Sequence, residues 1–300
     1  MKRSKKIVLS FIAAVGVSVL LACGGGGGSS TPATQTAYFI DSAVGGLQYT
    51  SGSLSGVTGA DGSFQYQAGQ PVTFKIGNLT LGSVTPGSKN IYPVDLVSGA
   101  TDQIDANVTL ISQVLQTLDD DGDPSNGITL SSSTQNALAS GSFSAIQLNS
   151  AVAADATSQL AAALQASPIT RSAGTTNALI PTAAAQAHLQ SSLLSQYINT
   201  TWKGTYSGAE DSGTCQLTIS SVGGSTLPAG TITTTGTCTS SVNSSYPVFN
   251  LTGYVASSGA WTAGISSSGA SYVGSLAKNG TASGTWKNNG YSGTWTMTKQ

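Results

Sequence analysis

The sequence predicts a mainly β protein with a helical middle segment: a small N-terminal antiparallel β-sandwich, then helices, then a C-terminal eight-stranded antiparallel meander barrel. Short alternating runs broken by Gly and Pro fill residues 37–98, and apolar residues recur at three- and four-residue steps within residues 99–199. Eight further alternating runs occupy residues 200–300. Only 8% of the 300 residues are charged, against about 25% in typical soluble proteins, so Ser, Thr and Gly supply the polar surface.

The first 22 residues predict a bacterial export signal. MKRSKK is basic, and the apolar run IVLSFIAAVGVSVL is too short for a lasting membrane span. The segment LLAC, Leu20–Cys23, resembles the cleavage site of bacterial lipoproteins; an ordinary secretory signal with a chance cysteine is the alternative. The resemblance implies that Cys23 becomes the acylated first residue, carrying palmitate, and that Gly24 in place of Asp directs it to the outer membrane. Residues 23–36 then form a flexible linker.

The charge balance argues against nucleic-acid binding. Loss of residues 1–22 leaves seven basic and twelve acidic residues, a formal net charge of −5, and no basic patch. The expected location is the bacterial cell envelope, lipid-anchored at the outer membrane. Expected partners are the membrane itself through the anchor and an envelope protein, a glycan or a small apolar ligand.

The cysteines predict one disulfide bond. With Cys23 acylated, Cys215 and Cys238 remain as a pair in an oxidising compartment. They lie in two Thr-rich runs, and a hairpin that places them opposite each other also sets Leu217 across from Gly236 and Ile219 across from Thr234. A reactive or metal-binding role is the poorer interpretation, because no third thiol or nearby His completes a ligand set.

The first β segment has a loose family resemblance. GVTGADGSFQYQAGQPVTFKIG is similar to the carboxypeptidase-regulatory or prealbumin-like β-domains of secreted bacterial proteins. Such modules mostly serve as spacers or stabilisers, so the resemblance implies a sandwich and no active residue.

The stretch LDDDGDPSNGI predicts a calcium site. A helix is expected to begin with Thr101 or Asp102 as N-cap and to end on Asp119, where four carboxylates add to the negative end of the helix dipole. A bound Ca²⁺ would reverse the sign, and the expected ligands are the side chains of Asp119, Asp121, Asp123 and Asn126. It is not an EF-hand, because Pro and Leu occupy that loop's required Gly and Glu positions. A solvated acidic turn is the alternative.

Two further helices are predicted, within residues 145–165 and 182–198. The acidic turn followed by an Ala-His-Leu helix resembles uncharacterised Gram-negative outer-membrane lipoproteins, which implies no activity. His188 is the single histidine of the sequence, and a packed or capping role is favoured over a catalytic one.

The last hundred residues predict the barrel. The runs TWKGTYSG, SGTWKNNG and SGTWTMTK resemble the Gly-Thr-Trp strands of lipocalin- and avidin-type barrels, in which tryptophans line a ligand cavity. By that resemblance the candidate ligand-lining residues are Trp202, Trp261, Trp286 and Trp295. A barrel filled by its own side chains is favoured, because few polar groups share that face.

Enzymatic activity is not expected, because no nucleophile elbow, phosphate loop, zinc signature or separated carboxylate pair occurs. The predicted function is therefore that of an outer-membrane-anchored, non-enzymatic binding or display lipoprotein, steadied by calcium. The alternative is a carrier of a small apolar ligand in the barrel.

Overall fold

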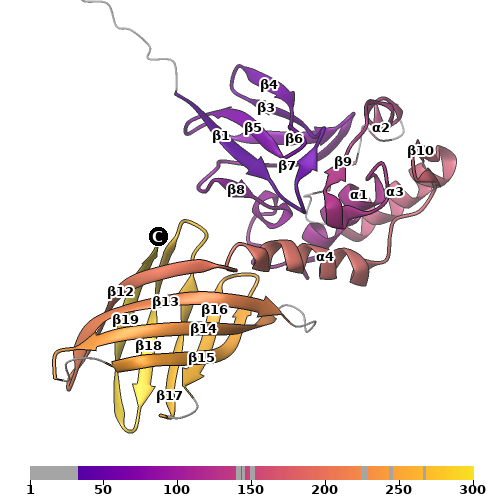
Figure 1. Cartoon of the computed structure of the whole chain (residues 1–300). Coiled ribbons are helices and arrows are strands. Elements are labelled where there is room, and N and C mark those ends of the chain that lie inside the picture. The colour runs from indigo at the N-terminus through magenta and orange to yellow at the C-terminus, as the bar shows by residue number, and fades with distance from the viewer. Residues whose placement is uncertain are drawn as a thin grey trace, which may run out of the picture. The chain divides into compact units, whose positions relative to one another are not determined.

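The computed structural model describes residues 33–139, 143, 146–148, 153–223, 229–242, 246–265 and 268–300. It confirms a mainly β fold with four α-helices, small N-terminal sheets and a C-terminal closed barrel (Figure 1). The predicted signal segment, Cys23 and most of the predicted linker lie outside these residues. None of the described helices is long and apolar enough to cross a membrane.

The N-terminal strands form two small sheets. One has the order β5-β1-β8 and the other the order β4-β3-β6-β7. The strands are β1 (Thr34–Phe39), β3 (Gln48–Ser51), β4 (Leu54–Val57), β5 (Ser63–Gln67), β6 (Val72–Ile76), β7 (Leu79–Val84) and β8 (Asn90–Ile91). The sheets meet through aromatic rings, with the centroid of Phe74 4.8 Å from that of Phe39 and 5.1 Å from that of Phe64.

Two short parallel pairs accompany the predicted antiparallel strands. β8 lies parallel to β1, and β2 (Val44–Gly45) lies parallel to β9 (Ile128–Thr129). Both parallel pairs join strands far apart in the sequence, as parallel pairing requires a long crossover connection. The second pair brings the segment after β1 against the end of the acidic stretch.

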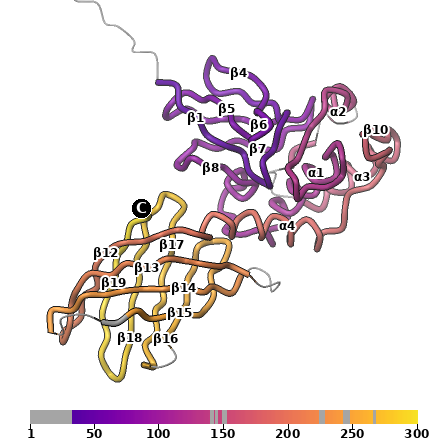
Figure 2. The backbone as a smooth tube through the Cα atoms, viewed as in Figure 1, coloured from indigo at the N-terminus to yellow at the C-terminus, as the bar shows by residue number. Residues whose placement is uncertain are grey.

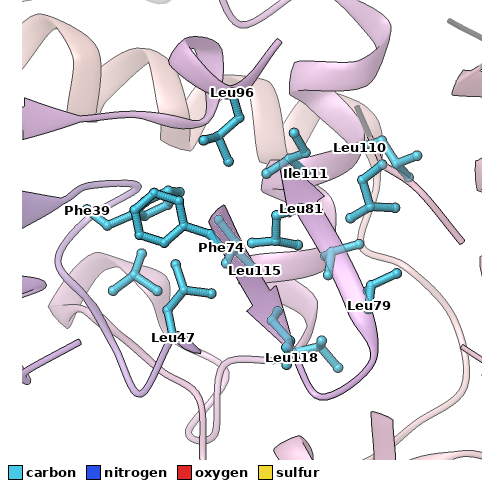
Figure 3. Close-up of a cluster of buried hydrophobic side chains, with 14 of the residues drawn as sticks. Phe39, Leu47, Phe74, Leu79, Leu81, Leu96, Leu110, Ile111, Leu115 and Leu118 are labelled. Carbon is cyan, nitrogen blue, oxygen red and sulfur yellow. The ribbon is translucent and has the colours of Figure 1, made fainter. Parts of the chain in front are cut away.

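The helical segment packs on the sheets. Its elements are η1 (Pro93–Leu96), α1 (Ala106–Thr117), η2 (Pro124–Asn126), α2 (Ser132–Leu138), α3 (Ala153–Ala166), the hairpin β10 (Ile169–Arg171) and β11 (Gly174–Thr176), and α4 (Thr182–Ser195). Phe39, Phe74 and Leu81 from strands share one buried cluster with Ile111 and Leu115 of α1 (Figure 3). The predicted sandwich and helical segments therefore build a common core.

Helix α1 begins later than predicted. Its N-cap is Asp105, whose carboxylate accepts hydrogen bonds from the backbone N–H groups of Asn107 and Val108 at 2.9 and 3.2 Å. Asp102 instead accepts the N–H of Ile104 in a turn that precedes the helix. Thr101, Asp102 and Asp105 are all of types that cap helices, so residue type alone does not select among them.

The barrel is a closed meander in which each strand pairs with the next and β19 closes onto β12 (Figure 2). Its strands are β12 (Thr200–Gly208), β13 (Ser212–Gly223), β14 (Ala229–Ser240), β15 (Tyr246–Ala256), β16 (Ala260–Ile265), β17 (Ala270–Leu276), β18 (Thr281–Asn288) and β19 (Tyr291–Lys299). All eight predicted strands are confirmed. Closure gives each of the eight described strands a partner on both sides.

The predicted hairpin register is also confirmed. Cys215 stands opposite Cys238 with a Cα–Cα distance of 4.2 Å, and the two form a disulfide bond. Leu217 pairs with Gly236 and Ile219 with Thr234, as the alternation predicts.

Candidate functional site

The acidic turn follows α1 directly and begins with a buried carboxylate. Asp119 is 0% exposed; its Oδ1 accepts the N–H of Thr129 at 2.8 Å, and its Oδ2 is buried without a hydrogen-bond partner. Burial raises the pKa of Asp119 to about 6, and the neighbouring Asp121 carboxyl contributes to the rise, while the Thr129 hydrogen bond and the Arg171 charge oppose it. An oxygen held in this way is costly to leave unpaired.

The other predicted ligands are partly engaged within the turn. Asp121 accepts the N–H of Asp123 at 3.0 Å and the side-chain amide of Asn126 at 2.9 Å, which lower its pKa. Asp123 accepts both the N–H and the hydroxyl of Ser125, at 3.1 and 2.6 Å. The structure thus links Asp119, Asp121 and Asn126, whereas one oxygen of Asp123 is held by Ser125. In the described part of the chain, no three His, Cys, Asp or Glu side chains are arranged to hold a metal ion.

A cation that the sequence argument missed lies beside this turn. Arg171, in the hairpin β10–β11, donates from Nη1 to the main-chain carbonyl of Asp119 at 2.7 Å. Asp120 turns toward the same hairpin, where it accepts hydrogen bonds from the backbone and hydroxyl of Ser172. The guanidinium offsets part of the negative charge at the end of α1. Because Arg171 is 52 residues from Asp119 in the sequence, no local spacing predicts the contact.

A second polar cluster joins the end of β1 to α4. Asp41 is completely buried, and the amide of Gln116 donates to both its oxygens, at 3.3 and 3.1 Å. Burial raises the pKa of Asp41 to about 7. His188 lies with Nε2 3.1 Å from the Ser42 hydroxyl and 3.3 Å from the Asp41 carbonyl oxygen. Burial also lowers the pKa of His188, and this half-buried ring is packed as predicted, with hydrogen bonds that tie α4 to the β1 turn.

The cluster lacks the geometry of a catalytic triad. The Asp41 carboxylate is 3.9 Å from His188 Nε2, the same ring nitrogen that contacts Ser42. In a triad the acid orients the opposite nitrogen, which leaves Nε2 to accept the serine proton. Ser42 does have a left-handed backbone, φ 53°, but its N–H is donated to Ser192, which secures the turn against α4.

One end of the barrel is closed by packing. Leu194 and Tyr197, at the end of α4, join the barrel's buried cluster, and the Tyr197 hydroxyl donates to the carbonyl of Leu276 at 3.3 Å. Three of the four candidate tryptophans belong to this cluster and are at most 3% exposed: Trp202, Trp261 and Trp295. Trp261 and Trp295 contact each other edge to face, with centroids 5.1 Å apart. These three side chains therefore fill the interior.

The fourth tryptophan stands at the other end of the barrel, among half-buried aromatic side chains. We call this set the mouth ring: Tyr206, Phe249, Tyr272, Trp286 and the disulfide Cys215–Cys238. These side chains come from the ends of β12, β14 and β18 and the beginnings of β13, β15 and β17, which place them at the end away from Leu194 and Tyr197. The ring thus gathers aromatic surface that the core leaves partly open.

Hydrogen bonds hold the mouth ring in position. The Tyr206 hydroxyl donates to Asp211 at 2.7 Å, and Asp211 also accepts from the Ser240 and Ser241 hydroxyls. The indole N–H of Trp286 donates to the carbonyl of Ser207 at 3.3 Å. The Tyr206 and Trp286 rings meet edge to face, with centroids 6.0 Å apart, so these two side chains support each other's positions.

A shallow depression lies elsewhere, on the N-terminal sandwich. It has a volume of about 480 Å³ and includes Gln35, Tyr66 and Lys89 in its lining. The Tyr66 hydroxyl is bonded to Gln35 at 2.6 Å, and the Lys89 ammonium lies over the Tyr38 ring. Tyr66 is the single aromatic side chain in its lining, so this depression does not gather aromatic surface as the mouth ring does.

Comparisons with known proteins add little to this geometry. No protein-family model matches the chain, and no curated protein matches it. A solved structure described as a "De novo design of a fluorescence-activating beta barrel" is similar at 15% identity and a TM-score of 0.27, with 36% of this chain and 97% of that chain covered. A likeness of this strength says nothing about function.

The buried Asp41 generates a testable pH dependence. Its pKa in the folded protein, about 7, is above the ordinary 3.8, so proton binding stabilises the fold below pH 4 and this contribution is lost as the pH rises through 7. We predict that Asp41→Asn flattens the pH dependence of the unfolding free energy by roughly 2 to 4 kcal/mol between pH 4 and 8. Urea unfolding at a series of pH values measures it.

Asp119, whose pKa is also raised by burial, is present in both proteins, so its contribution cancels in the difference. The matched control Asp155→Asn removes an exposed acid from α3 and should keep the wild-type profile. An Asp41→Asn profile parallel to the wild type would contradict the raised pKa.

Proposed function

We propose that the protein is a non-enzymatic binding lipoprotein of the bacterial outer membrane that takes a small, largely apolar aromatic ligand at the mouth ring. One observation carries the proposal: residues at the end of α4 pack into one barrel end, whereas the other end holds four half-buried aromatic side chains and a disulfide bond. Ligand sites are mostly apolar and aromatic, with a few fixed polar groups. The mouth ring has this composition.

The rigidity of the ring supports binding by a preformed site. Tyr206 and Trp286 are fixed through their own polar atoms, and the disulfide joins neighbouring strands of the ring. A ligand would therefore find the aromatic faces already ordered, which lowers the entropy cost of association. The three fully buried tryptophans take no part in this proposal, because their rings are covered by the packed core.

Anchoring is supported by the sequence alone, through the basic and apolar start of the chain and the LLAC segment. We predict that Cys23→Ser moves the protein from the membrane fraction to the soluble fraction of the envelope, because a single acylated residue is the expected tether. Fractionation followed by immunoblotting measures the change, and Cys215→Ser serves as the control that should stay in the membrane. Unchanged partition of Cys23→Ser would reject the lipid anchor.

Ligand binding at the mouth ring is tested with N-phenyl-1-naphthylamine, a neutral probe that fluoresces in apolar sites. We predict saturable binding to the full chain and at least a tenfold weaker affinity for Trp286→Ala, since about 1.4 kcal/mol is lost with one aromatic face. Tyr254→Ala removes an exposed tyrosine of β15 instead and should bind as the wild type does. Absence of saturable binding to the wild type, or equal loss in both variants, would contradict a site at the mouth.

Calcium binding at the acidic turn is a second candidate function, favoured by the buried and unpartnered Oδ2 of Asp119. Ca²⁺ that binds only the folded state at about 100 times its dissociation constant would add about 2.7 kcal/mol to the unfolding free energy, with less from Mg²⁺. We predict that the melting temperature rises with Ca²⁺, and that joint replacement of Asp119, Asp121 and Asp123 by Asn removes the rise. Glu210→Gln, an exposed charge on a barrel turn, is the matched control. A wild-type melting curve that neither Ca²⁺ nor EDTA changes would contradict calcium binding. The negative charge of the turn would then be offset by Arg171 alone.

A further inference from the structure

We infer that Asn288 makes the mouth ring select aromatic ligands that carry a hydrogen-bond donor. The inference rests on the proposed function, because it concerns the ligand of the same site. Asn288 is the last residue of β18, two positions after Trp286, and both are half-buried while Lys287 between them is exposed. Because side chains alternate along a strand, the Asn288 amide and the Trp286 indole belong to the inward face at the open end.

The position of Asn288 is fixed by a tight turn. It pairs with Tyr291 across the hairpin of β18 and β19, and the two loop residues Asn289 and Gly290 have φ values of 47° and 90°. A two-residue loop with both φ values positive matches the twist of the flanking strands and holds the register. The backbone that carries the amide is therefore as well ordered as the rest of the ring.

The carbonyl oxygen of the Asn288 side chain lacks a partner. Oδ1 is buried, and no group in the described residues donates a hydrogen bond to it. A buried acceptor left unpaired costs about 1 to 3 kcal/mol, and most such groups in native proteins are paired. A ligand N–H or O–H that reached this oxygen would remove that cost.

Two other unpartnered polar atoms of the barrel do not serve this role. The Thr234 hydroxyl and the Trp261 indole N–H are also without partners among the described residues, but these two residues are 0% and 3% exposed within the packed core. An ordered water is the usual partner of such enclosed atoms. The Asn288 oxygen is enclosed to the same degree, but it differs in its place: it belongs to the last residue of β18, at the barrel end away from α4 and two positions from Trp286.

The remaining polar atoms of the ring explain why a donor is selected. The Trp286 N–H is donated to Ser207, and the Tyr206 hydroxyl is donated to Asp211. Asn288 Oδ1 is thus a buried acceptor without a partner among the described residues, and the Tyr206 and Trp286 donors are already used. The ligand class that fits is a neutral flat aromatic compound with one ring N–H or O–H, of which indoles and phenols are simple members.

The test uses two ring systems of the same shape, indole and benzothiophene, which differ by the N–H that only indole carries. We expect the wild-type full chain to bind indole about tenfold more tightly in calorimetric titrations, as one satisfied hydrogen bond to a buried acceptor implies. Asn288→Leu should weaken indole to the level of benzothiophene and leave benzothiophene unchanged. Asn288→Asp, which keeps an acceptor oxygen, should retain the preference.

Asn250→Leu is the matched control, because this asparagine accepts a hydrogen bond from Thr235 on an exposed part of the wall. It should keep the tenfold preference, and thermal melts of every variant establish that each is folded. Equal binding of the two compounds by the wild type, or a preference that survives Asn288→Leu, contradicts the role of Asn288 but not ligand binding at the mouth ring. If neither compound binds, both the role of Asn288 and ligand binding at the mouth ring are contradicted.

Discussion

The barrel depends on glycines that stand where tryptophan rings need space. A Cβ atom on Gly274 or Gly284 would lie 2.4 or 2.5 Å from the Trp295 ring, too close for any residue other than glycine. Gly208 and Gly293 accommodate the Trp286 indole in the same manner, with hypothetical contacts of 2.7 and 2.6 Å. An eight-stranded barrel has an interior just wide enough for side chains, so each large ring requires small residues on the strands beside it.

The packing of large rings against glycines on neighbouring strands contributes to which tryptophans are buried. Trp295 spans two glycines in the middle of β17 and β18, and it is enclosed by the core. Trp286 rests on glycines at the ends of β12 and β19, where the chain turns and fewer strands can cover it. The partial burial of the mouth ring therefore follows from the positions of the glycines along the strands, together with the packing of α4 at the opposite end.

How far the sequence predicts this arrangement can be judged from particular residues. The eight strands and the pairing of Cys215 with Cys238 were predicted, because a period of two and short turns specify register locally. The contact of Arg171 with Asp119 and that of Gln116 with Asp41 were not predicted, because each joins segments far apart in the sequence. Local sequence does not separate Trp202, Trp261 and Trp295 from Trp286, because their burial depends on the glycines of neighbouring strands and on α4 at one barrel end.

The same helix links the two parts of the protein energetically. α4 contacts α1 through polar groups: Gln116 donates to the carbonyl of Ala185 as well as to Asp41, and Gln186 donates to Thr109. Buried amides must all be paired to be stable, so this interface tolerates few alternative positions of the helix. Its far end carries Leu194 and Tyr197 into the barrel. Because α4 ends five residues before β12 begins at Thr200, it lies at the barrel end where β12 starts, and Trp286 and its neighbours lie at the other end.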